Sequence, residues 1–140
     1  MKFIFLTNRF YIDYSHCSEI EQKRERPYAQ IYIECNGVNF AIPFRSNIKH
    51  SYAYWTDKEN RAGIDYTKAV VLENDKYIDT TAVPYIRPNE FKALLGKNYN
   101  VVTGMAKYIA RYKKAKEFPH RPENTRLLKY STLQYFENYI

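Results

Sequence analysis

Residues 28 to 44, YAQIYIECNGVNFAIPF, carry the strongest structural signal in the chain. Two runs of alternating residues flank Asn36-Gly37, the preferred loop of a two-residue type I′ hairpin. If Cys35 pairs with Val38, one face of the hairpin is wholly apolar and is expected to be core. The members of this face are Ala29, Ile31, Ile33, Cys35, Val38, Phe40, Ile42 and Phe44.

Further strands are predicted on both sides of this hairpin. The run FIFLTNRFYI, residues 3–12, predicts a first strand that is buried at its start. Residues 13–27 are charged and lack a clear period, so they predict a mobile loop or an excursion with a short helix. A second hairpin is expected around Asn74-Asp75.

The remainder of the chain predicts helices. A helix begins near Pro88 and ends near Gly96, and the longest helix covers residues 100–118 before Pro119 and Pro122 break it. Its core stripe at i, i+3, i+4 and i+7 spacing is Met105, Tyr108, Ile109 and Tyr112. Its separate basic face is Lys107, Arg111 and Lys114.

A short final helix is expected after Ser131, which forms a capping-box pattern with Gln134. Strands followed by helices predict an α+β fold with a small, curled antiparallel sheet. A length of 140 residues is most simply one domain with a real core.

The charge of the chain is positive and uneven. The net charge is +7, and residues 101–140 carry 8 basic and 3 acidic side chains, whereas residues 1–100 carry 14 and 12. Aromatic residues make up 17% of the chain, with 15 tyrosines that can line a surface groove. This combination favours a polyanionic partner such as nucleic acid, and a solubilising lysine face is the alternative.

The two cysteines, Cys17 and Cys35, have no disulfide-framework spacing, which is typical of a reducing cytoplasm. Residues 1–6 are too short for the apolar core of a signal peptide. No run approaches about 20 apolar residues, so no membrane span is expected. These features predict a cytoplasmic protein.

A compact polar cluster follows the second strand of the first hairpin. Arg45, Ser46, Lys49 and His50 lie within six residues of one another, and the hairpin register sets Tyr28 beside Arg45. A strand end entering a solvated turn, capped by Ser46, is one interpretation. A site that binds a phosphate is the other.

Familiar metal and cofactor motifs are absent from the sequence. The histidines stand alone, and there is no HxxxH, CxxC, GxxxxGK or GxGxxG spacing. Neither a metal nor a nucleotide cofactor is therefore expected. A nucleophilic Cys17 is less favoured than a plain thiol.

The cluster suits RNA cleavage without a metal, in which the 2′-hydroxyl attacks the neighbouring phosphorus. Arg45 and Lys49 suit the negative charge that grows on the phosphate, and Ser46 can donate to a non-bridging oxygen. His50 is a candidate proton carrier near neutral pH, with a tyrosine as the other choice.

The stretch Ile31–His50, IYIECNGVNFAIPFRSNIKH, resembles the ToxN/AbiQ group of type III toxin–antitoxin endoribonucleases. The whole chain is most similar to the CptN/TenpN branch. In that family a strand ends in an apolar residue, Pro, another apolar residue, Thr/Ser-Ser and a following lysine. Arg45 replaces a frequent hydroxyl here, and Lys49 lies one residue later than in the family pattern.

The resemblance implies a barrel-like antiparallel sheet, similar to Kid/MazF toxins, with helices packed around it. It implies metal-independent cleavage of cellular mRNA that leaves 2′,3′-cyclic phosphate and 5′-hydroxyl ends. It also implies a repetitive pseudoknot RNA antitoxin that the toxin trims and binds in a closed toxin–RNA assembly. The catalytic candidates are Ser46 and Lys49, which match the family pattern, Arg45 and Tyr28, which lie beside them, and His50, which is kept on chemical grounds.

The RNA-binding candidates are basic and aromatic residues outside the cluster. They are Tyr11, Lys23, Tyr52, Tyr54, Trp55, Lys107, Arg111, Lys113, Lys114 and Lys116. Exposed aromatic rings can stack on splayed bases of single-stranded RNA. Two alternatives remain open, a non-catalytic RNA-binding module and a protein–protein interaction domain.

Overall fold

A computed structural model describes residues 1–22 and 28–140. The strands are β1 Lys2–Leu6, β2 Gln30–Cys35, β3 Val38–Arg45, β4 Ala53–Asp57, β5 Ala62–Asp65, β6 Val70–Val71 and β7 Ile78–Asp79. The α-helices are α1 Asn8–Asp13, α2 Pro88–Leu94, α3 Asn98–Glu117 and α4 Pro122–Tyr130. The 3-10 turns are η1 Tyr66–Lys68, η2 Asp75–Tyr77, η3 Thr132–Tyr135 and η4 Glu137–Tyr139.

The strands form one antiparallel sheet in the order β4-β5-β3-β2-β1-β7, with β6 paired to β3. The predicted hairpin register is confirmed, because Cys35 pairs with Val38 and Ile31 with Ile42. The sharp turn is possible because Asn36 and Gly37 both adopt positive φ, 53° and 77°.

Strand β3 is the organising strand because it has three partners. It pairs with β2 along its length, with β6 through Phe40 and Ala41, and with β5 through Phe44 and Arg45. The change of partner carries Arg45 away from β2 and toward β5. The sheet curls but, over the described residues, it does not close into a barrel. The predicted α+β class is confirmed.

Close approach of β4 to β5 requires a glycine opposite Arg45. A Cβ added to Gly63 would lie 2.1 Å from the carbonyl oxygen of Tyr54. Gly63 pairs with both Arg45 and Trp55, and a bulge between Trp55 and Asp57 shifts the register there. Bulges re-aim side chains at the ends of sheets, and this one lies beside the end of β3.

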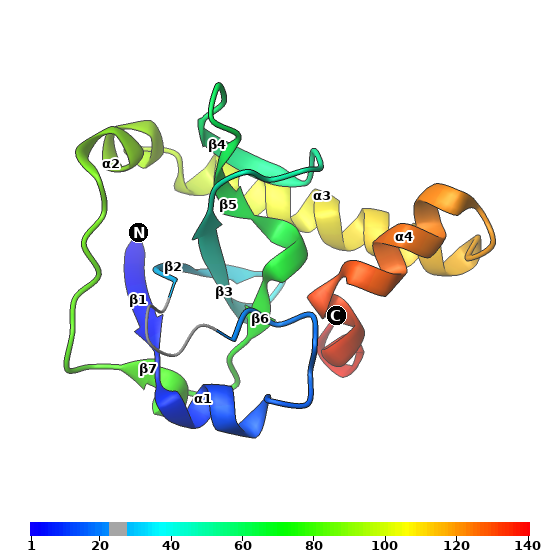
Figure 1. Ribbon diagram of the computed structural model, residues 1–140, viewed down its shortest axis with the longest axis horizontal. Coiled ribbons are helices and arrows are strands. Elements are labelled where there is room, and N and C mark those ends of the chain that lie inside the picture. Colours follow the sequence, from blue (N-terminus) through cyan, green and yellow to red (C-terminus); the bar gives the residue numbers. More distant parts are fainter. Residues whose placement is uncertain (23–27) are drawn as a thin grey trace.

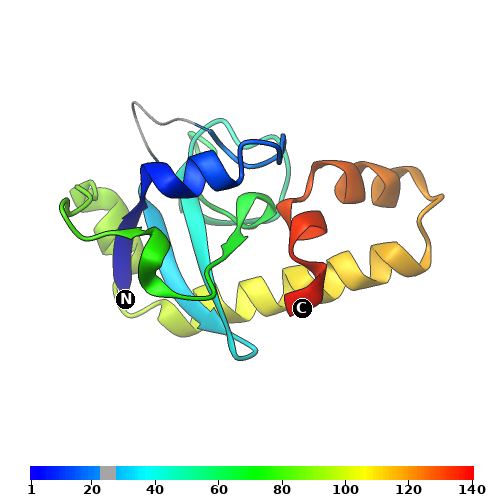
Figure 2. The same cartoon turned by 90° about the horizontal axis from the view of Figure 1, so that it is seen from below.

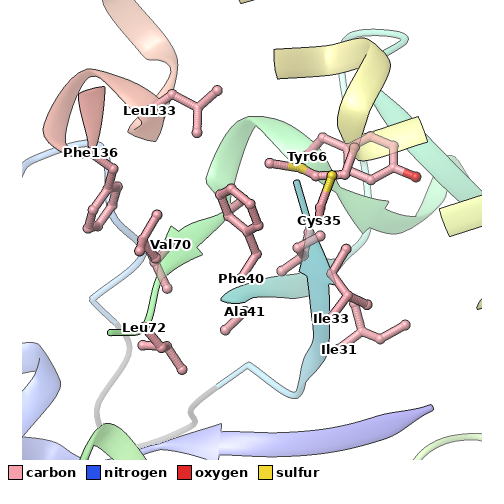
Figure 3. Close-up of a cluster of buried hydrophobic side chains, with 14 of the residues drawn as sticks. Ile31, Ile33, Cys35, Phe40, Ala41, Tyr66, Val70, Leu72, Leu133 and Phe136 are labelled. Carbon is pink, nitrogen blue, oxygen red and sulfur yellow. The ribbon is translucent and has the colours of Figure 1, made fainter. Parts of the chain in front are cut away.

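The core lies against the predicted apolar face of the hairpin. Figure 3 shows Ile31, Ile33 and Phe40 of this face gathered with side chains from η1, β6 and the C-terminal turns. The Cys35 thiol contacts the Val102 carbonyl at 3.7 Å, so this face packs on α3. The opposite face is only partly covered, since Ala41 is fully buried whereas Glu34 is exposed.

The helices lie on both sides of the sheet. Figure 1 shows α3 passing behind the sheet, and Figure 2 shows the sheet between α3 on one side and α1 on the other. The predicted α3 stripe is confirmed, because each of its four residues is buried. Those residues are Met105, Tyr108, Ile109 and Tyr112.

Two local predictions are wrong. The first strand ends at Leu6, because the side chain of Thr7 caps α1 by accepting from the Phe10 amide. The segment around Asn74-Asp75 is not a hairpin: β6 and β7 pair with other strands, and Asn74 caps η2. The predicted end of α3 before Pro119 is confirmed at Glu117, and Pro122 begins α4, a helix that the sequence analysis did not predict.

The final turn is shorter than expected, and Ser131 caps it without the reciprocal bond of a capping box, because the Ser131 amide donates to the Leu127 carbonyl. The Ser131 hydroxyl accepts from the Leu133 amide at 3.2 Å, while Gln134 donates to the Ser131 carbonyl at 2.8 Å. Ser131 therefore begins 3-10 turn η3 rather than an α-helix.

Candidate functional site

The site is built at the end of β3, where Arg45 reaches a buried carboxylate. Arg45 Nη1 donates to Asp65 Oδ2 at 2.7 Å, and its Nε lies 3.2 Å from Glu21 Oε1. The Asp65 side chain is fully buried, whereas the Arg45 side chain is 26% exposed. The guanidinium is therefore held on its buried side by Asp65, while the rest of it is accessible to solvent.

Asp65 is fully paired. Its Oδ1 accepts from the Thr67 hydroxyl at 2.7 Å, from the Thr67 amide at 3.0 Å, and from His50 Nε2 at 3.1 Å. We call Asp65 and its three partners, Arg45, His50 and Thr67, the Asp65 hub. Burial would raise the pKa of Asp65, but the hydrogen bonds from these partners lower it below its usual range. The same carboxylate and Glu21 outweigh the effect of burial on Arg45 and raise its pKa.

Both ring nitrogens of His50 are engaged within the protein. The Tyr52 amide donates to Nδ1 at 3.0 Å, so Nδ1 acts as the acceptor and Nε2 carries the proton toward Asp65. Nε2 also lies 3.2 Å from the Thr67 hydroxyl. This geometry suits a positioning residue more than the proton carrier predicted from sequence.

The loop between β3 and β4 is held in one shape. Arg61 donates from Nε to the Ile48 carbonyl at 2.6 Å and from Nη2 to the His50 carbonyl at 2.8 Å. Its guanidinium stacks on Trp55 at 4.8 Å from the ring centroid. Ile48 is 1% exposed and anchors the loop, while Asn47 adopts a positive φ of 55°. Ser46 and Lys49 are therefore exposed on a braced loop.

The C-terminal segment supports the hub from behind. The buried Thr132 hydroxyl donates to the Thr67 carbonyl at 3.1 Å and to the Ala69 carbonyl. The neighbouring Ser131 hydroxyl accepts from Tyr108 at 2.6 Å. Thr132 thus fixes the backbone of Thr67, which lies 65 positions earlier in the chain and donates to Asp65.

Two pockets open beside this site. The first pocket has a volume of about 480 Å³, and its lining includes Tyr28, Arg45, Ser46, Asn60 and Arg87. The second pocket has a volume of about 340 Å³, and its lining includes Lys49, His50, Tyr52, Lys68, Arg126 and Tyr130. Among the described residues, Arg45 alone lines both pockets. Both volumes fall within the range of about 300–1,000 Å³ that is typical of ligand sites.

The predicted cluster is divided between these pockets. Tyr28, Arg45 and Ser46 share the first pocket, as the hairpin register predicted, and Arg45, Lys49 and His50 share the second. Arg45 is therefore the link between the two groups.

The predicted RNA-contacting aromatic residues have different surroundings. The prediction for Tyr11 is wrong: its side chain is 2% exposed, and burial raises its pKa to about 12. Tyr52 and Tyr54 are half-buried and pack on the core, while Trp55 is half-buried under Arg61. Tyr52 lines the second pocket.

The predicted basic residues of α3 do not form one patch. Lys107, Arg111 and Lys114 share one helix face, as predicted, because their spacing is i, i+4 and i+7. Lys113 lies beside the β2–β3 hairpin in another pocket, and Lys116 forms an ion pair with Glu137. Lys23 lies outside the described residues.

The described residues contain no group of three or more His, Cys, Asp or Glu side chains that could hold a metal ion. Within the same residues, every helix is too short or too polar to cross a membrane.

Comparison with known proteins supports the fold. No protein-family model and no curated protein matches the chain. A solved structure described as "A processed non-coding RNA regulates a bacterial antiviral system" matches with a TM-score of 0.57 and 14% sequence identity. The match covers 83% of this chain and 88% of that chain. At this identity the similarity establishes the α+β fold alone.

Asp65 and Thr67 are the site residues that the sequence analysis missed. Asp65 ends a short apolar strand, which is an unusual place for a carboxylate. Thr67 follows two positions later, a spacing at which an Asp side chain commonly accepts from the backbone. These two features of the sequence together could have indicated that Asp65 and Thr67 belong to the site.

Proposed function

We propose that the protein is the toxin of a type III toxin–antitoxin system and acts as a metal-independent endoribonuclease in the cytoplasm. The observation that carries this proposal is the braced end of β3, where a fixed guanidinium and an exposed hydroxyl share one pocket. The ToxN/AbiQ resemblance at this strand and the fold similarity to a structure from an RNA-regulated antiviral system support it.

Arg45 and Ser46 would bind the scissile phosphate. Arg45 uses Nη1 and Nε in its ion pairs with Asp65 and Glu21, and Nη2 has no acceptor among the described residues. Nη2 can therefore donate to a non-bridging oxygen, and Ser46 can donate a second hydrogen bond. Lys49 would add positive charge from the other side of Arg45. Because Asp65 fixes the guanidinium before substrate arrives, little reorganisation is needed as charge develops.

The reaction would form one bond to phosphorus and break another. The 2′-oxygen attacks phosphorus and gives up its proton, while the bond to the 5′-oxygen breaks and that oxygen gains a proton. The products are a 2′,3′-cyclic phosphate and a 5′-hydroxyl. Tyr28 lines the same pocket and is the candidate for proton transfer, since both His50 nitrogens are occupied.

The RNA partner would be both substrate and inhibitor. We propose that a repetitive RNA antitoxin is trimmed into pseudoknots, which occupy the site and assemble with the toxin into a closed complex. The basic face of α3, formed by the exposed Lys107 and Lys114 and the half-buried Arg111, would contact its phosphates.

Replacement of Ser46 by alanine tests the proposal. The expected result is loss of cleavage by two orders of magnitude or more, in line with removal of a donor to a developing anion. Purified protein is incubated with a labelled transcript, and the 3′ ends are mapped and tested for a cyclic phosphate. Ser51→Ala is the matched control, because Ser51 is an exposed serine in the same loop. Full activity in Ser46→Ala would remove Ser46 from the mechanism.

A non-catalytic RNA-binding module is the second candidate. It is favoured by one observation, the engagement of both His50 nitrogens, which leaves that ring without a free site for proton exchange. The same assay decides between the candidates, because a binding module leaves the transcript intact.

A further inference from the structure

The second pocket lies on the side of Arg45 that faces α4. The residues that line it come from the β3–β4 loop, η1 and α4. Figure 1 shows α4 folding back from the end of α3 toward the sheet. We propose that this pocket binds one nucleotide of single-stranded RNA, next to the phosphate held at Arg45. This inference rests on the proposed function and adds a binding site on α4 to it.

Two cations at this pocket are available for phosphate groups. Lys49 and Arg126 are exposed, and neither has an ion pair among the described residues. Lys68, by contrast, is held by the Glu19 carboxylate at 3.4 Å and by the Tyr130 carbonyl at 3.3 Å. Lys68 therefore ties α4 to η1, whereas Lys49 of the β3–β4 loop and Arg126 of α4 bring unpaired charge to the pocket.

Two tyrosines supply rings at the same pocket. Tyr52 is half-buried, and its ring lies 5.8 Å from His50 and 5.5 Å from Tyr108 between centroids. Tyr130, at the last position of α4, is 48% exposed. An exposed ring that belongs to a fixed backbone is suited to stack on a base without a large loss of conformational freedom.

The position of Arg45 favours a nucleotide as the ligand of the second pocket. Arg45 lines both pockets, so an RNA strand that runs from the first pocket to the second must pass its guanidinium. An endonuclease holds nucleotides on both sides of the bond that it cuts, because both are needed to align the attack. Cations and rings in one pocket of about 340 Å³ match a phosphate and a base.

The test measures binding without cleavage. The probe is a mixed-sequence 12-nucleotide RNA with 2′-fluoro groups, which lacks the attacking hydroxyl, and affinity is followed by fluorescence anisotropy. Tyr130→Ala removes the ring on which one base stacks, so this variant should bind the probe about 5- to 150-fold more weakly. Tyr130→Phe keeps the ring and is expected to bind like the unmodified protein.

Arg126 is tested through the salt dependence of the same binding. Arg126→Gln should reduce the slope of log affinity against log salt concentration by about 0.7, the value for one phosphate contact on a single strand. Lys97→Gln is the control, because Lys97 is exposed at the opposite end of α3 from α4. Thermal unfolding confirms that each variant is folded.

The outcomes separate this inference from the proposed function. Weaker binding by Tyr130→Ala in a protein that never cuts RNA would keep the pocket and overturn the nuclease proposal. Cleavage of RNA with unchanged affinity in Tyr130→Ala and an unchanged slope in Arg126→Gln would overturn the pocket and keep the nuclease. Absence of binding by the unmodified protein would also overturn the pocket.

Discussion

Replacing Asp65 by asparagine removes the negative charge at the centre of the hub. The new amide places a donor where Arg45, Thr67 and His50 all donate at present. Breaking a buried ion pair typically costs about 3–5 kcal/mol. The lower end, about 3 kcal/mol, applies here because the Arg45 side chain is 26% exposed and keeps Glu21. A domain of this size is stable by about 5–15 kcal/mol, so the variant should fold.

The dependence on pH identifies the cause of this loss. The pKa of Asp65 is lower in the folded protein than in the unfolded chain, so its stabilisation is present above the unfolded pKa of about 3.9. That contribution is lost as the pH falls through the lower folded pKa. The difference in unfolding free energy between the native protein and Asp65→Asn should therefore be largest near pH 7 and should shrink toward pH 3.

Urea unfolding followed by the fluorescence of Trp55, the single tryptophan, measures this difference. The control is Asp75→Asn, an exposed aspartate for which a change within about 0.5 kcal/mol is expected. A loss below 1 kcal/mol at pH 7, or a loss that stays constant down to pH 3, would refute the account of Asp65 as the charged centre. RNA cleavage by Asp65→Asn should also fall, because Arg45 is no longer fixed.

Other predictions concern packing, competition and metal. In chemical unfolding, Gly104→Ala should destabilise the protein by about 1–3 kcal/mol, because the new Cβ would lie 2.3 Å from the buried Tyr66 hydroxyl. This cost outweighs the better helix propensity of alanine. The same substitution should cost less in a protein that already carries Tyr66→Phe. Glu21→Gln should tighten binding of mixed-sequence RNA several-fold, since the Glu21 carboxylate beside Arg45 repels an incoming phosphate; equal anisotropy curves would contradict this. Cleavage should persist in EDTA, and its loss on chelation, with recovery on adding a divalent ion, would reveal a metal requirement.

Local patterns were sufficient for the parts of the fold that depend on neighbouring residues. The register of β2 and β3 follows from a period of two around Asn36-Gly37, and a slip by one residue would expose the whole apolar face. The buried stripe of α3 follows from helical periodicity over twenty residues. In both cases one segment contains all of the information.

The hub depends on contacts between distant segments and had no such pattern. Arg45 and Asp65 are 20 positions apart, and Thr67 is braced by Thr132 a further 65 positions along. The strands β6 and β7 have two residues each, too few to show a period. Their pairing with β3 and β1 is set by the tertiary packing of the sheet, which a local analysis does not include.

The Thr132 brace has a consequence for synthesis on the ribosome. Thr67 leaves the ribosome well before Thr132, so the newly made strands can pair while the carbonyl of Thr67 still lacks its final partner. The hub is complete only after the C-terminal turns have emerged and docked against η1. Under the proposed function, the active site of a nascent chain is therefore assembled only after Thr132 has left the ribosome.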